Sequence, residues 1–431
     1  MDSEIKAIVL AAGKGTRMKS SLVKVLHEIF SKPLLAWVLD ALNNLPYKTE
    51  NIVIVGHCAQ AVEEYLEKKY QNAKTATQKE QLGTGHAVAQ ALPLLEGYDG
   101  KVIITCGDTP LLTTKTLNEF ILYHDENKSD LTVMTTKFEN PFGYGRIIRD
   151  KNNQVEKIVE QKDATEEEKL VDEVNTGVYC LEWSKIKQAF SELKNNNAQG
   201  EYYLTDIVKW ANEKSLKVAG FVAKDSSEIY GINSRQNLEI ATKIMKDRYL
   251  DELMTQGVTI VDRATTFISP ETTIGEDTII YPNTYINGKN EIAKNCKVGP
   301  MTHIRGNCSI AEGCKIGNFV ELKNAKIAKK TNVCHLTYVG DANIGEHVNI
   351  GAGTIFANYN SITKEKKSST LGNNVSIGSN TVIVAPCVLG ENAFVGAGSV
   401  ITKDVEKDAL AICRNVQKEY KNWVKLKKGE N

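Results

Sequence analysis

The second half of the chain repeats an aliphatic residue at every sixth position. An α-helix repeats its faces every 3.6 residues and a strand every 2, so neither element explains this period. Hexads are typical of a parallel β-helix, in which each six-residue side points one aliphatic side chain inward and stacks on the coil below. The first run comprises Ile268, Ile274, Ile280, Ile286, Ile292, Val298, Ile304, Ile310, Ile316 and Leu322.

One long interruption divides the rest of this pattern. Polar and basic residues occupy Phe356 to Thr370, where inward aliphatic side chains are expected. Because the hexads resume afterwards, we expect the solenoid to display this segment as an inserted loop. The flanking inward positions are Ile327, Val333, Val339, Ile344 and Ile350 before it, and Leu371, Ile377, Ile383, Leu389, Val395 and Ile401 after it.

The first half of the chain alternates strand and helix patterns. Pro33 opens one predicted helix, whose apolar residues Leu35, Leu39 and Leu42 share a face. Strands that alternate with crossover helices form a mainly parallel, Rossmann-like sheet that is covered on both faces and binds ligands beyond the carboxyl ends of its strands. Buried strands are predicted at Ile5–Ala11, Asn51–Gly56, Lys101–Cys106, Asp130–Thr136 and Val174–Leu181.

These patterns predict three parts of the chain. A long helix is expected from about residue 234 to 256, and Gly257 ends it. We therefore assign residues 1–228 to an α/β domain, 229–257 to a helical linker and 258–431 to the hexad domain.

Composition and charge argue against a partner bound through a broad charged surface. The chain has 431 residues, and its 53 basic and 53 acidic residues cancel. Attraction to nucleic acid or to an anionic membrane is therefore not expected, although a neutral net charge is compatible with a local phosphate-binding pocket. The apolar stretch Ile5–Ala12 follows two acidic residues and does not fit a signal peptide, and no run reaches the ~18 apolar residues of a membrane span.

The nine cysteines form no CxxC pair, which disfavours a disulfide framework and a thiolate zinc site. Four of them occupy the fifth position of their hexads, where threonine also occurs, so we expect small buried side chains there. A reduced, cytoplasmic protein is the resulting expectation. The four cysteines are Cys296, Cys308, Cys314 and Cys387.

A glycine-rich loop with nearby cations follows the first predicted strand. Leu10–Met18 reads LAAGKGTRM, and Lys24 comes shortly after. Glycines let the backbone approach a phosphate, and Arg17 and Lys24 supply positive charge. The loop does not fit the dinucleotide fingerprint, because Met18 replaces the third glycine, and no GK[ST] completes a Walker pattern. An anion-binding loop and a tight structural turn both fit this segment.

A carboxylate follows another predicted strand at the same edge of the sheet. Gly107 and Asp108 come directly after Lys101–Cys106. Magnesium takes one or two protein ligands and completes its shell with phosphate oxygens and water, so one aspartate can begin such a site. The alternative role for Asp108 is to cap a helix or turn.

Several motifs together resemble the sugar-nucleotide pyrophosphorylases. More narrowly, Asn195–Tyr203 and the hexad domain resemble the bacterial bifunctional N-acetylglucosamine-1-phosphate uridyltransferases and glucosamine-1-phosphate acetyltransferases. The resemblance covers nearly the whole chain, and it implies a left-handed β-helix and a homotrimer with the acetyl site between subunits. The N-terminal motifs are Leu10–Met18 with Lys24, Gln78–Gly85, Gly107-Asp108 and Gly143–Arg146.

The resemblance implies two consecutive reactions. Acetyl-CoA would acetylate glucosamine-1-phosphate, and UTP would then transfer its uridylyl group to N-acetylglucosamine-1-phosphate with release of pyrophosphate. The product, UDP-N-acetylglucosamine, is the precursor of bacterial envelope polymers, peptidoglycan and lipopolysaccharide among them.

For the uridylyl step, the resemblance gives Arg17 and Lys24 the task of neutralising charge, and Asp108 and Asn233 the task of binding Mg²⁺. Lys24 and Asn233 would also contact substrate. Such a transfer depends on positioning and charge stabilisation and needs no covalent intermediate. The residues implied for the uridine and its phosphates are Leu10, Ala11, Ala12, Gly13, Gln78, Gly83 and Thr84, and those implied for the sugar are Gly145, Glu160 and Asn175.

Two residues depart from the family pattern. Val23 stands where a proline usually precedes the lysine, so we expect a looser loop that holds Lys24 less firmly. Cys106 stands where a tyrosine usually lies two residues before the metal carboxylate. Cys106 is compatible with two roles, as a neutral side chain that fills a gap and as a reactive thiol.

His335 is the third residue of its hexad, at or near a turn and outside the inward column. The resemblance implies that it takes a proton from the amine of glucosamine-1-phosphate, a task that suits imidazole, and that Glu321 orients or assists it. The residues implied for the sugar phosphate are Arg305, Lys323, Tyr338, Asn349 and a lysine of the inserted loop, and those implied for acetyl-CoA are Ala352, Asn358, Tyr359, Ser379, Ala397 and Arg414.

The inserted loop is about two residues longer than the family pattern and has Asn360-Ser361 where Asp-Gly usually follows Asn-Tyr. Lys364 and Lys366 are therefore both candidates for the phosphate contact.

Two other functions compete with this hypothesis. A monofunctional sugar-1-phosphate nucleotidyltransferase could use the solenoid only for oligomerisation, but His335, Asn358 and Tyr359 argue against it. Translation exchange-factor subunits combine similar domains and act by binding, but they need neither the glycine-rich loop nor Asp108.

Overall fold

The computed structural model describes residues 4–429. The chain forms two compact units that divide between Ile244 and Met245, inside the long helix α8 (Arg235–Thr255). The predicted helix is thus present, and Gly257 follows it with a φ of 90°. Among the described residues, no helix has the length and apolar character that crossing a membrane requires.

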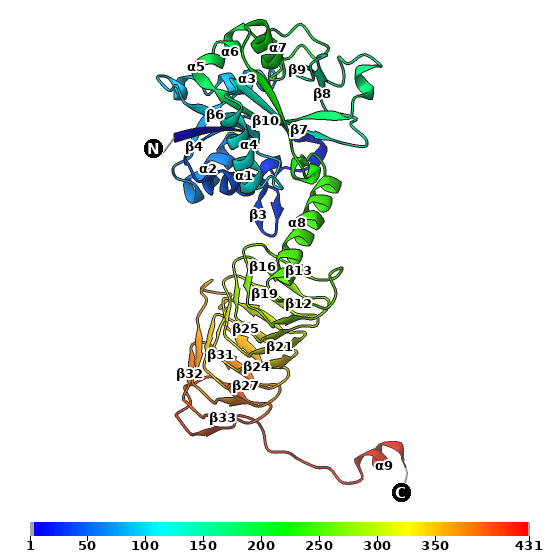
Figure 1. Cartoon of the computed structure of the whole chain (residues 1–431). Coiled ribbons are helices and arrows are strands. Elements are labelled where there is room, and N and C mark those ends of the chain that lie inside the picture. The colour runs from blue at the N-terminus through cyan, green and yellow to red at the C-terminus, as the bar shows by residue number, and fades with distance from the viewer. Residues whose placement is uncertain (1–3, 430–431) are drawn as a thin grey trace. The chain divides into compact units, whose positions relative to one another are not determined.

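The N-terminal unit is built on a mixed sheet (Figure 1). Its main path runs in the order β11-β7-β10-β6-β1-β4-β5. All five predicted strands are present, and most pairs are parallel, but β10 runs antiparallel to β6 and β7. The bounds are β1 Glu4–Leu10, β4 Lys48–Val55, β5 Lys74–Thr77, β6 Lys101–Cys106, β7 Leu131–Lys137, β10 Glu173–Glu182 and β11 Val218–Val222.

Two short antiparallel ribbons accompany this sheet. The hairpin of β8 (Arg146–Arg149) and β9 (Val155–Val159) joins it through β10, and β2 (Glu28–Ile29) pairs with β3 (Lys32–Pro33). These ribbons were not predicted, because their strands are too short to show an alternating pattern.

Helices cover both faces of the sheet, as the sequence predicted. Neighbouring strand residues such as Ile8 and Val9 point to opposite faces and join separate apolar clusters. One cluster includes residues of α1 (Leu34–Asn43), α2 (Ala59–Lys69) and α4 (Thr114–Glu126). The other includes residues of α3 (Thr84–Ala89), α5 (Trp183–Ile186), α6 (Ala189–Glu192) and α7 (Asp206–Glu213).

The C-terminal unit is a left-handed parallel β-helix of hexapeptide repeats, as expected (Figure 1). Three ladders of short parallel strands form its sides, and every predicted inward aliphatic residue is buried. The first ladder comprises β12 Thr259–Ile260, β15 Ile279–Ile280, β18 Lys297–Val298, β21 Lys315–Asn318, β24 Asn332–His335, β27 Asn349–Ile350, β30 Ser376–Ile377, β33 Phe394–Val395 and β35 Leu410–Ala411.

The other two ladders complete each coil. The second comprises β13 Phe267–Ile268, β16 Tyr285–Asn287, β19 His303–Arg305, β22 Glu321–Lys323, β25 Tyr338–Gly340, β28 Ile355–Ala357, β31 Val382–Val384 and β34 Val400–Ile401. The third comprises β14 Thr273–Ile274, β17 Glu291–Ile292, β20 Ser309–Ile310, β23 Lys326–Ile327, β26 Ala342–Ile344, β29 Ser369–Leu371 and β32 Cys387–Leu389. A short helix, α9 (Trp423–Lys428), lies near the C-terminus.

The fifth hexad positions are small and buried, as predicted, and many of them tie one coil to the next. Thr278 and Thr302 donate from their hydroxyls to the carbonyls of Ala293 (2.9 Å) and Gly317 (2.6 Å). Cys314 replaces threonine in the same role, with Sγ 3.1 Å from the carbonyl of Ala328. All nine cysteines are free.

Both predicted bounds of the inserted loop were wrong, because Phe356 and Thr370 each lie in a strand. Phe356 lies in β28 opposite Ile383 and is fully buried, so it is an inward residue of the column. The pattern missed it because an aromatic ring fills a position that aliphatic residues occupy elsewhere. The insertion therefore begins at Asn358 and ends where β29 starts at Ser369.

Phe356→Ala is expected to destabilise the solenoid by about 3–5 kcal/mol, the usual cost of removing a buried phenyl ring. Chemical denaturation of the full chain measures the effect. The neighbouring Ile355→Ala is the control, because Ile355 is 40% exposed and should cost much less. Equal effects of the two substitutions would contradict the burial of Phe356.

Candidate active sites

The first candidate site is a cleft of about 250 Å³ in the N-terminal unit. It lies at the carboxyl ends of β1 and β6, where parallel sheets bind ligands. The cleft brings together most of the residues that the sequence predicted for UTP and metal. Its lining consists of Leu10, Ala11, Ala12, Gly13, Lys24, Val25, Gln78, Gln81, Gly83, Thr84, Ala87, Cys106, Asp108 and Glu201.

The segment after residue 195 fixes one wall of this cleft. Backbone hydrogen bonds of 2.8 Å join Tyr202 N to Leu82 O and Gly85 N to Tyr202 O. Gly83 has a φ of 114°, and a Cβ there would lie 2.6 Å from the carbonyl oxygen of Tyr202, so only glycine fits. The buried side chain of Gln78 donates a hydrogen bond of 3.0 Å to the carbonyl of Gly83 and so also holds the loop that contains Gly83.

The three residues predicted for the sugar lie next to one another. Asn175 N donates to Gly145 O at 2.9 Å, and a Cβ on Gly145 would come 3.5 Å from Glu160 Oε1. Burial raises the pKa of Glu160, and Thr205 donates a hydrogen bond of 3.2 Å to its carboxyl group. The same Cβ would come 3.1 Å from Ile158 Cγ2, so the backbone at Gly145 packs closely beside the polar side chains of Glu160 and Asn175.

Lys24, Asp108 and Asn233 converge at one point. The ammonium of Lys24 donates to Asp108 Oδ2 and, at 3.2 Å, to Asn233 Oδ1. A hydrogen bond of 2.9 Å from Ile232 N to Asp108 O brings the Asn233 segment to the sheet edge. Carboxylate and amide oxygens are the ligands that Mg²⁺ prefers, and these two already share one cation. The donor set therefore fits a divalent ion.

The remaining predicted residues of this region have different surroundings. Arg17 is exposed on a 3₁₀ turn (Thr16–Met18) and is not among the described residues that line the cleft. Val23 has a φ of −57°, within the range that proline imposes, so its backbone keeps the conformation of the usual residue. Burial raises the pKa of Cys106 to about 12. A thiol of that kind is neutral at physiological pH, which favours the gap-filling role over the reactive one.

The second candidate site follows one corner of the solenoid. The residues predicted for acetyl-CoA, Ala352, Ser379 and Ala397, occupy the same third hexad position as His335 on successive coils of the first ladder. Adjacent coils lie about 4.8 Å apart, so this column extends roughly 14 Å from His335. Arg414 donates to the carbonyl of Ala397 at 2.7 Å and marks its far end.

His335 is exposed at the end of β24, outside the packed column as predicted. Its Nδ1 lies 3.0 Å from the amide oxygen of Asn318, which occupies the same position one coil earlier. That oxygen can only accept, so Nδ1 carries the proton and Nε2 keeps the lone pair that a general base needs. Sequence reasoning missed Asn318, although its third hexad position could have revealed it.

The inserted loop folds as a small hairpin, which separates the two candidate lysines. Tyr359 pairs with Lys366 across it, and Asn360 N donates to Glu365 O at 2.9 Å. Lys364 lies at the turn with a φ of 61°. Lys366 lies on the returning arm, where its positive charge, together with burial, lowers the pKa of Lys323. Two adjacent ammonium groups of this kind favour an anion between them.

Other residues predicted for this corner already have partners within the chain. Arg305 donates to Glu321 Oε1 at 2.6 Å from Nε, so the structure joins these two side chains. The buried Asn358 donates to Asp341 at 2.5 Å. Sequence reasoning missed Asp341, because nothing in its hexad distinguishes it from a polar corner residue. Tyr338 lies beside Glu321 in the second ladder, and Asn349 is exposed on the first.

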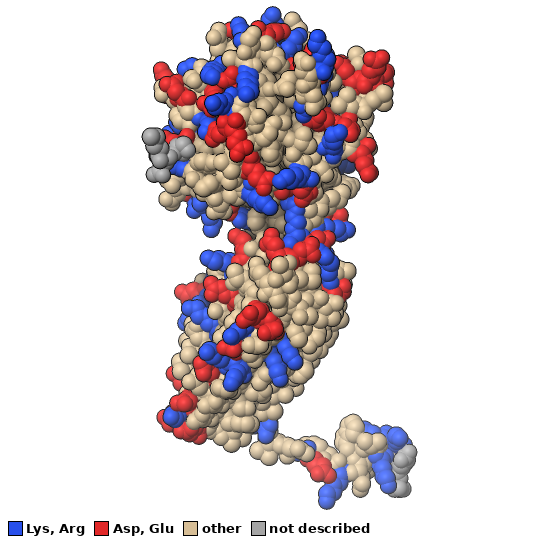
Figure 2. Space-filling model, in the orientation of Figure 1, with Lys and Arg blue, Asp and Glu red and all other residues tan. Residues whose placement is uncertain are grey.

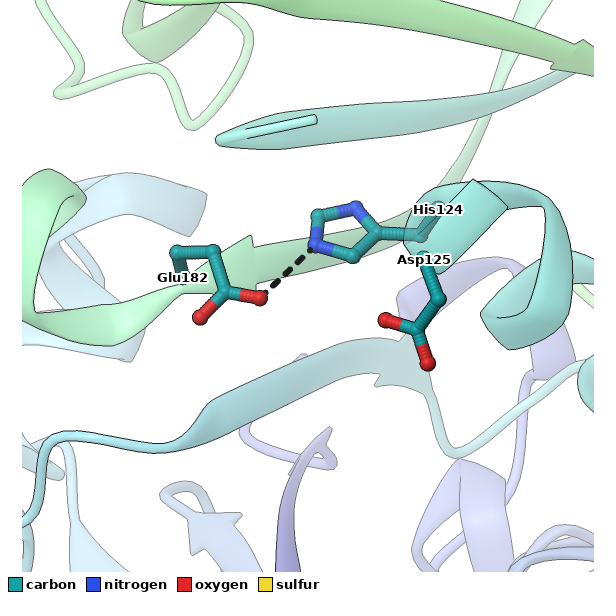
Figure 3. A group of neighbouring side chains, drawn as sticks. All are labelled: His124, Asp125 and Glu182. Atoms are coloured by element: carbon teal, nitrogen blue, oxygen red, sulfur yellow. Dashed lines mark hydrogen bonds and ion pairs between the residues drawn. The ribbon is translucent and has the colours of Figure 1, made fainter. Parts of the chain in front are cut away.

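A third cluster lies at the other end of β6 and consists of His124, Asp125 and Glu182 (Figure 3). His124 Nε2 faces Glu182 Oε1 at 3.3 Å, and Nδ1 lies 2.7 Å from Thr132 Oγ1. Lys101 neutralises Asp125 at 2.7 Å. Each member thus has a partner within the cluster or beside it, which indicates a structural charge network.

Over the face in Figure 2, acidic and basic side chains are likewise interspersed.

Comparison with known proteins gives matches over nearly the whole chain. The profile "Nucleotidyl transferase" matches residues 6–240, and "Bacterial transferase hexapeptide (six repeats)" matches 291–324 and 368–403. The "Bifunctional protein GlmU" of Clostridioides difficile is 42% identical, and the match covers 98% of both chains. Proteins of the same name from Halalkalibacterium halodurans and Caldanaerobacter subterraneus subsp. tengcongensis are 41% and 43% identical over at least 98% of each chain.

The buried His124 should make the N-terminal unit sensitive to acid. Burial lowers its pKa below the ordinary value of 6.5 in spite of Glu182, so the folded chain binds the proton less readily than the unfolded chain does. Its contribution to stability is therefore lost as the pH falls below about 6.5. Between pH 7 and pH 5, His124→Gln should lose less stability than the native chain does, as measured by urea unfolding. The exposed His57→Gln is the control, and an unchanged slope in His124→Gln would refute this account.

Proposed function

The chain belongs to the family of bifunctional GlmU proteins, and from this premise we propose how its two sites divide the two reactions. The enzyme acetylates glucosamine-1-phosphate from acetyl-CoA and then joins N-acetylglucosamine-1-phosphate to the uridylyl group of UTP. Uridylyl transfer belongs to the N-terminal cleft and acetyl transfer to the His335 corner. The observation that carries this division is that the N-terminal cleft places Lys24 beside a glycine-rich loop, whereas the His335 corner places Lys323 and Lys366 beside a column of small residues.

In the N-terminal cleft, the chain positions two phosphorylated substrates. The Leu10–Gly13 backbone and Gln78 hold the nucleotide, while Glu160 and Asn175 orient the sugar. A phosphate oxygen of the sugar attacks the α-phosphorus of UTP, and the bond to pyrophosphate breaks. Lys24 stabilises the charge that develops on the phosphates.

Nucleotidyl transfer requires a metal, which we assign as Mg²⁺; Asp108 and Asn233 would hold it. When bound, this ion supplies positive charge to the phosphates. The hard oxygens of both side chains support the assignment.

In the acetyl site, His335 accepts a proton at Nε2 from the amine of glucosamine-1-phosphate. The nitrogen forms a bond to the thioester carbonyl carbon, the carbon–sulfur bond breaks, and the sulfur leaves with the proton as the thiol of coenzyme A. Asn318 keeps the imidazole in the required tautomer. Lys323 and Lys366 bind the sugar phosphate, with Arg305, Tyr338 and Asn349 around it. Assistance from Glu321 stays a prediction.

The solenoid assembles as a homotrimer in this proposal. Met301, Phe319 and Leu336 follow one another at fourth hexad positions beside His335 and are 47%, 54% and 60% exposed. The positive φ of all three recurs at other fourth hexad positions, such as Asn295 and Lys330, so the turn imposes it. It is the exposed apolar character of the three side chains that supports the ridge as a contact surface. Packing of subunits along it would close the acetyl site. The free cysteines support a cytoplasmic enzyme.

The two activities should be separable by single substitutions. Asp108→Ala is expected to lower uridylyl transfer at least about 100-fold and leave acetyl transfer intact, whereas His335→Ala should do the reverse. Each half reaction is followed separately, pyrophosphate release with UTP and free thiol release with acetyl-CoA. If either substitution leaves its assigned reaction unchanged, that site assignment is wrong.

The lysines of the inserted loop should differ in importance. Lys366→Met is expected to raise the KM for glucosamine-1-phosphate about tenfold or more with a small effect on kcat, because a charged phosphate contact is lost. Lys364→Met is the matched control, at the turn of the same hairpin. A larger effect of Lys364→Met would reverse the assignment.

A further inference from the structure

We propose that the Lys24 ammonium competes with the divalent ion for the oxygens of Asp108 and Asn233, so that metal and nucleotide bind with positive cooperativity. Lys24 would occupy the metal position in the free enzyme and move to the phosphates when the nucleotide arrives. This inference rests on the proposed function and concerns the order of events at that site.

The contacts of Lys24 place its charge where the metal is assigned. One ammonium bonds to both Asp108 Oδ2 and Asn233 Oδ1, the two oxygens proposed as metal ligands. The side chains of Lys24 and Asp108 are only 15% and 14% exposed, so water screens their attraction weakly. A divalent ion bound to the same two oxygens would lie next to the ammonium, and the two cations would repel each other. Metal binding to the free enzyme therefore requires Lys24 to leave.

The nucleotide offers Lys24 another partner. A Cβ on Gly15 would lie 2.7 Å from Lys24 Cβ, so the lysine stem packs against the glycine-rich loop. Gly13 has open space where a side chain would project, and both Gly13 and Lys24 line the cleft. Rotation of the flexible lysine side chain can thus carry its ammonium from Asp108 to phosphates bound on this loop.

The exchange replaces one cationic partner of Asp108 by another. The carboxylate is never left without a cation in a largely buried place, which would be costly. Nucleotide removes the competitor and thereby strengthens metal binding, and by linkage the metal strengthens nucleotide binding by the same factor.

The test measures metal affinity without catalysis. Mn²⁺ replaces Mg²⁺ as the probe, and the electron paramagnetic resonance signal of free Mn²⁺ is followed while the full chain is titrated without nucleotide. Lys24→Met should bind Mn²⁺ about tenfold more tightly than the native chain, within the usual range of such coupling. Lys24→Gln should do the same. Lys19→Met, which removes an exposed lysine nearby, should not change the affinity.

A second titration measures the coupling. A non-hydrolysable UTP analogue should tighten Mn²⁺ binding more in the native chain than in Lys24→Met, where no competitor remains to be removed. The inference is overturned if both Lys24 variants bind Mn²⁺ as weakly as the native chain, or if the analogue helps all chains equally.

Asp108→Ala separates the two possible failures. If it abolishes Mn²⁺ binding while the Lys24 variants show no gain, the metal site stands and only the competition is refuted. If Asp108→Ala leaves Mn²⁺ binding unchanged, the metal assignment under the proposed function fails together with the competition.

Discussion

In-register pairing of parallel strands is the constraint on which both sites depend. In the N-terminal unit, β1, β5 and β6 end at the same edge, with β4 paired between β1 and β5, and this brings together the Gly13 loop, Gln78 and Asp108 from distant parts of the sequence. In the solenoid, the same pairing repeats each hexad position vertically, so His335 and Ala352 belong to one corner column. A slip of register would remove these side chains from the column that they share. The register of the strands therefore determines where the functional side chains lie as well as how the chain folds.

The two sites solve related electrostatic problems differently. Each must bind a phosphorylated sugar, but the N-terminal cleft keeps its cation paired with Asp108 in the free enzyme. The acetyl corner instead leaves Lys323 and Lys366 adjacent and exposed to their mutual repulsion, which lowers the pKa of Lys323. The first arrangement favours exchange of one cation for another, and the second favours direct capture of an anion.

Much of this arrangement could be predicted from the sequence, because it follows from periodicity. The hexads indicated the solenoid and placed His335 outside its column, and the strand pattern placed Asp108 at a sheet edge. Phe356 was missed because the pattern counted aliphatic residues, and an aromatic ring fills the same inward place. Asn318 was missed although it shares the third hexad position of His335. Asp341 and the choice between Lys364 and Lys366 could not be predicted, since they depend on contacts across coils and on the fold of one hairpin.

The central claim is that one chain carries out two consecutive transfers at two separate sites. The most direct test supplies the purified full chain with glucosamine-1-phosphate, acetyl-CoA, UTP and Mg²⁺ and identifies the products by mass spectrometry over time. We predict transient N-acetylglucosamine-1-phosphate followed by UDP-N-acetylglucosamine, with one free coenzyme A and one pyrophosphate for each product molecule. Accumulation of UDP-glucosamine without acetylation would contradict the claim.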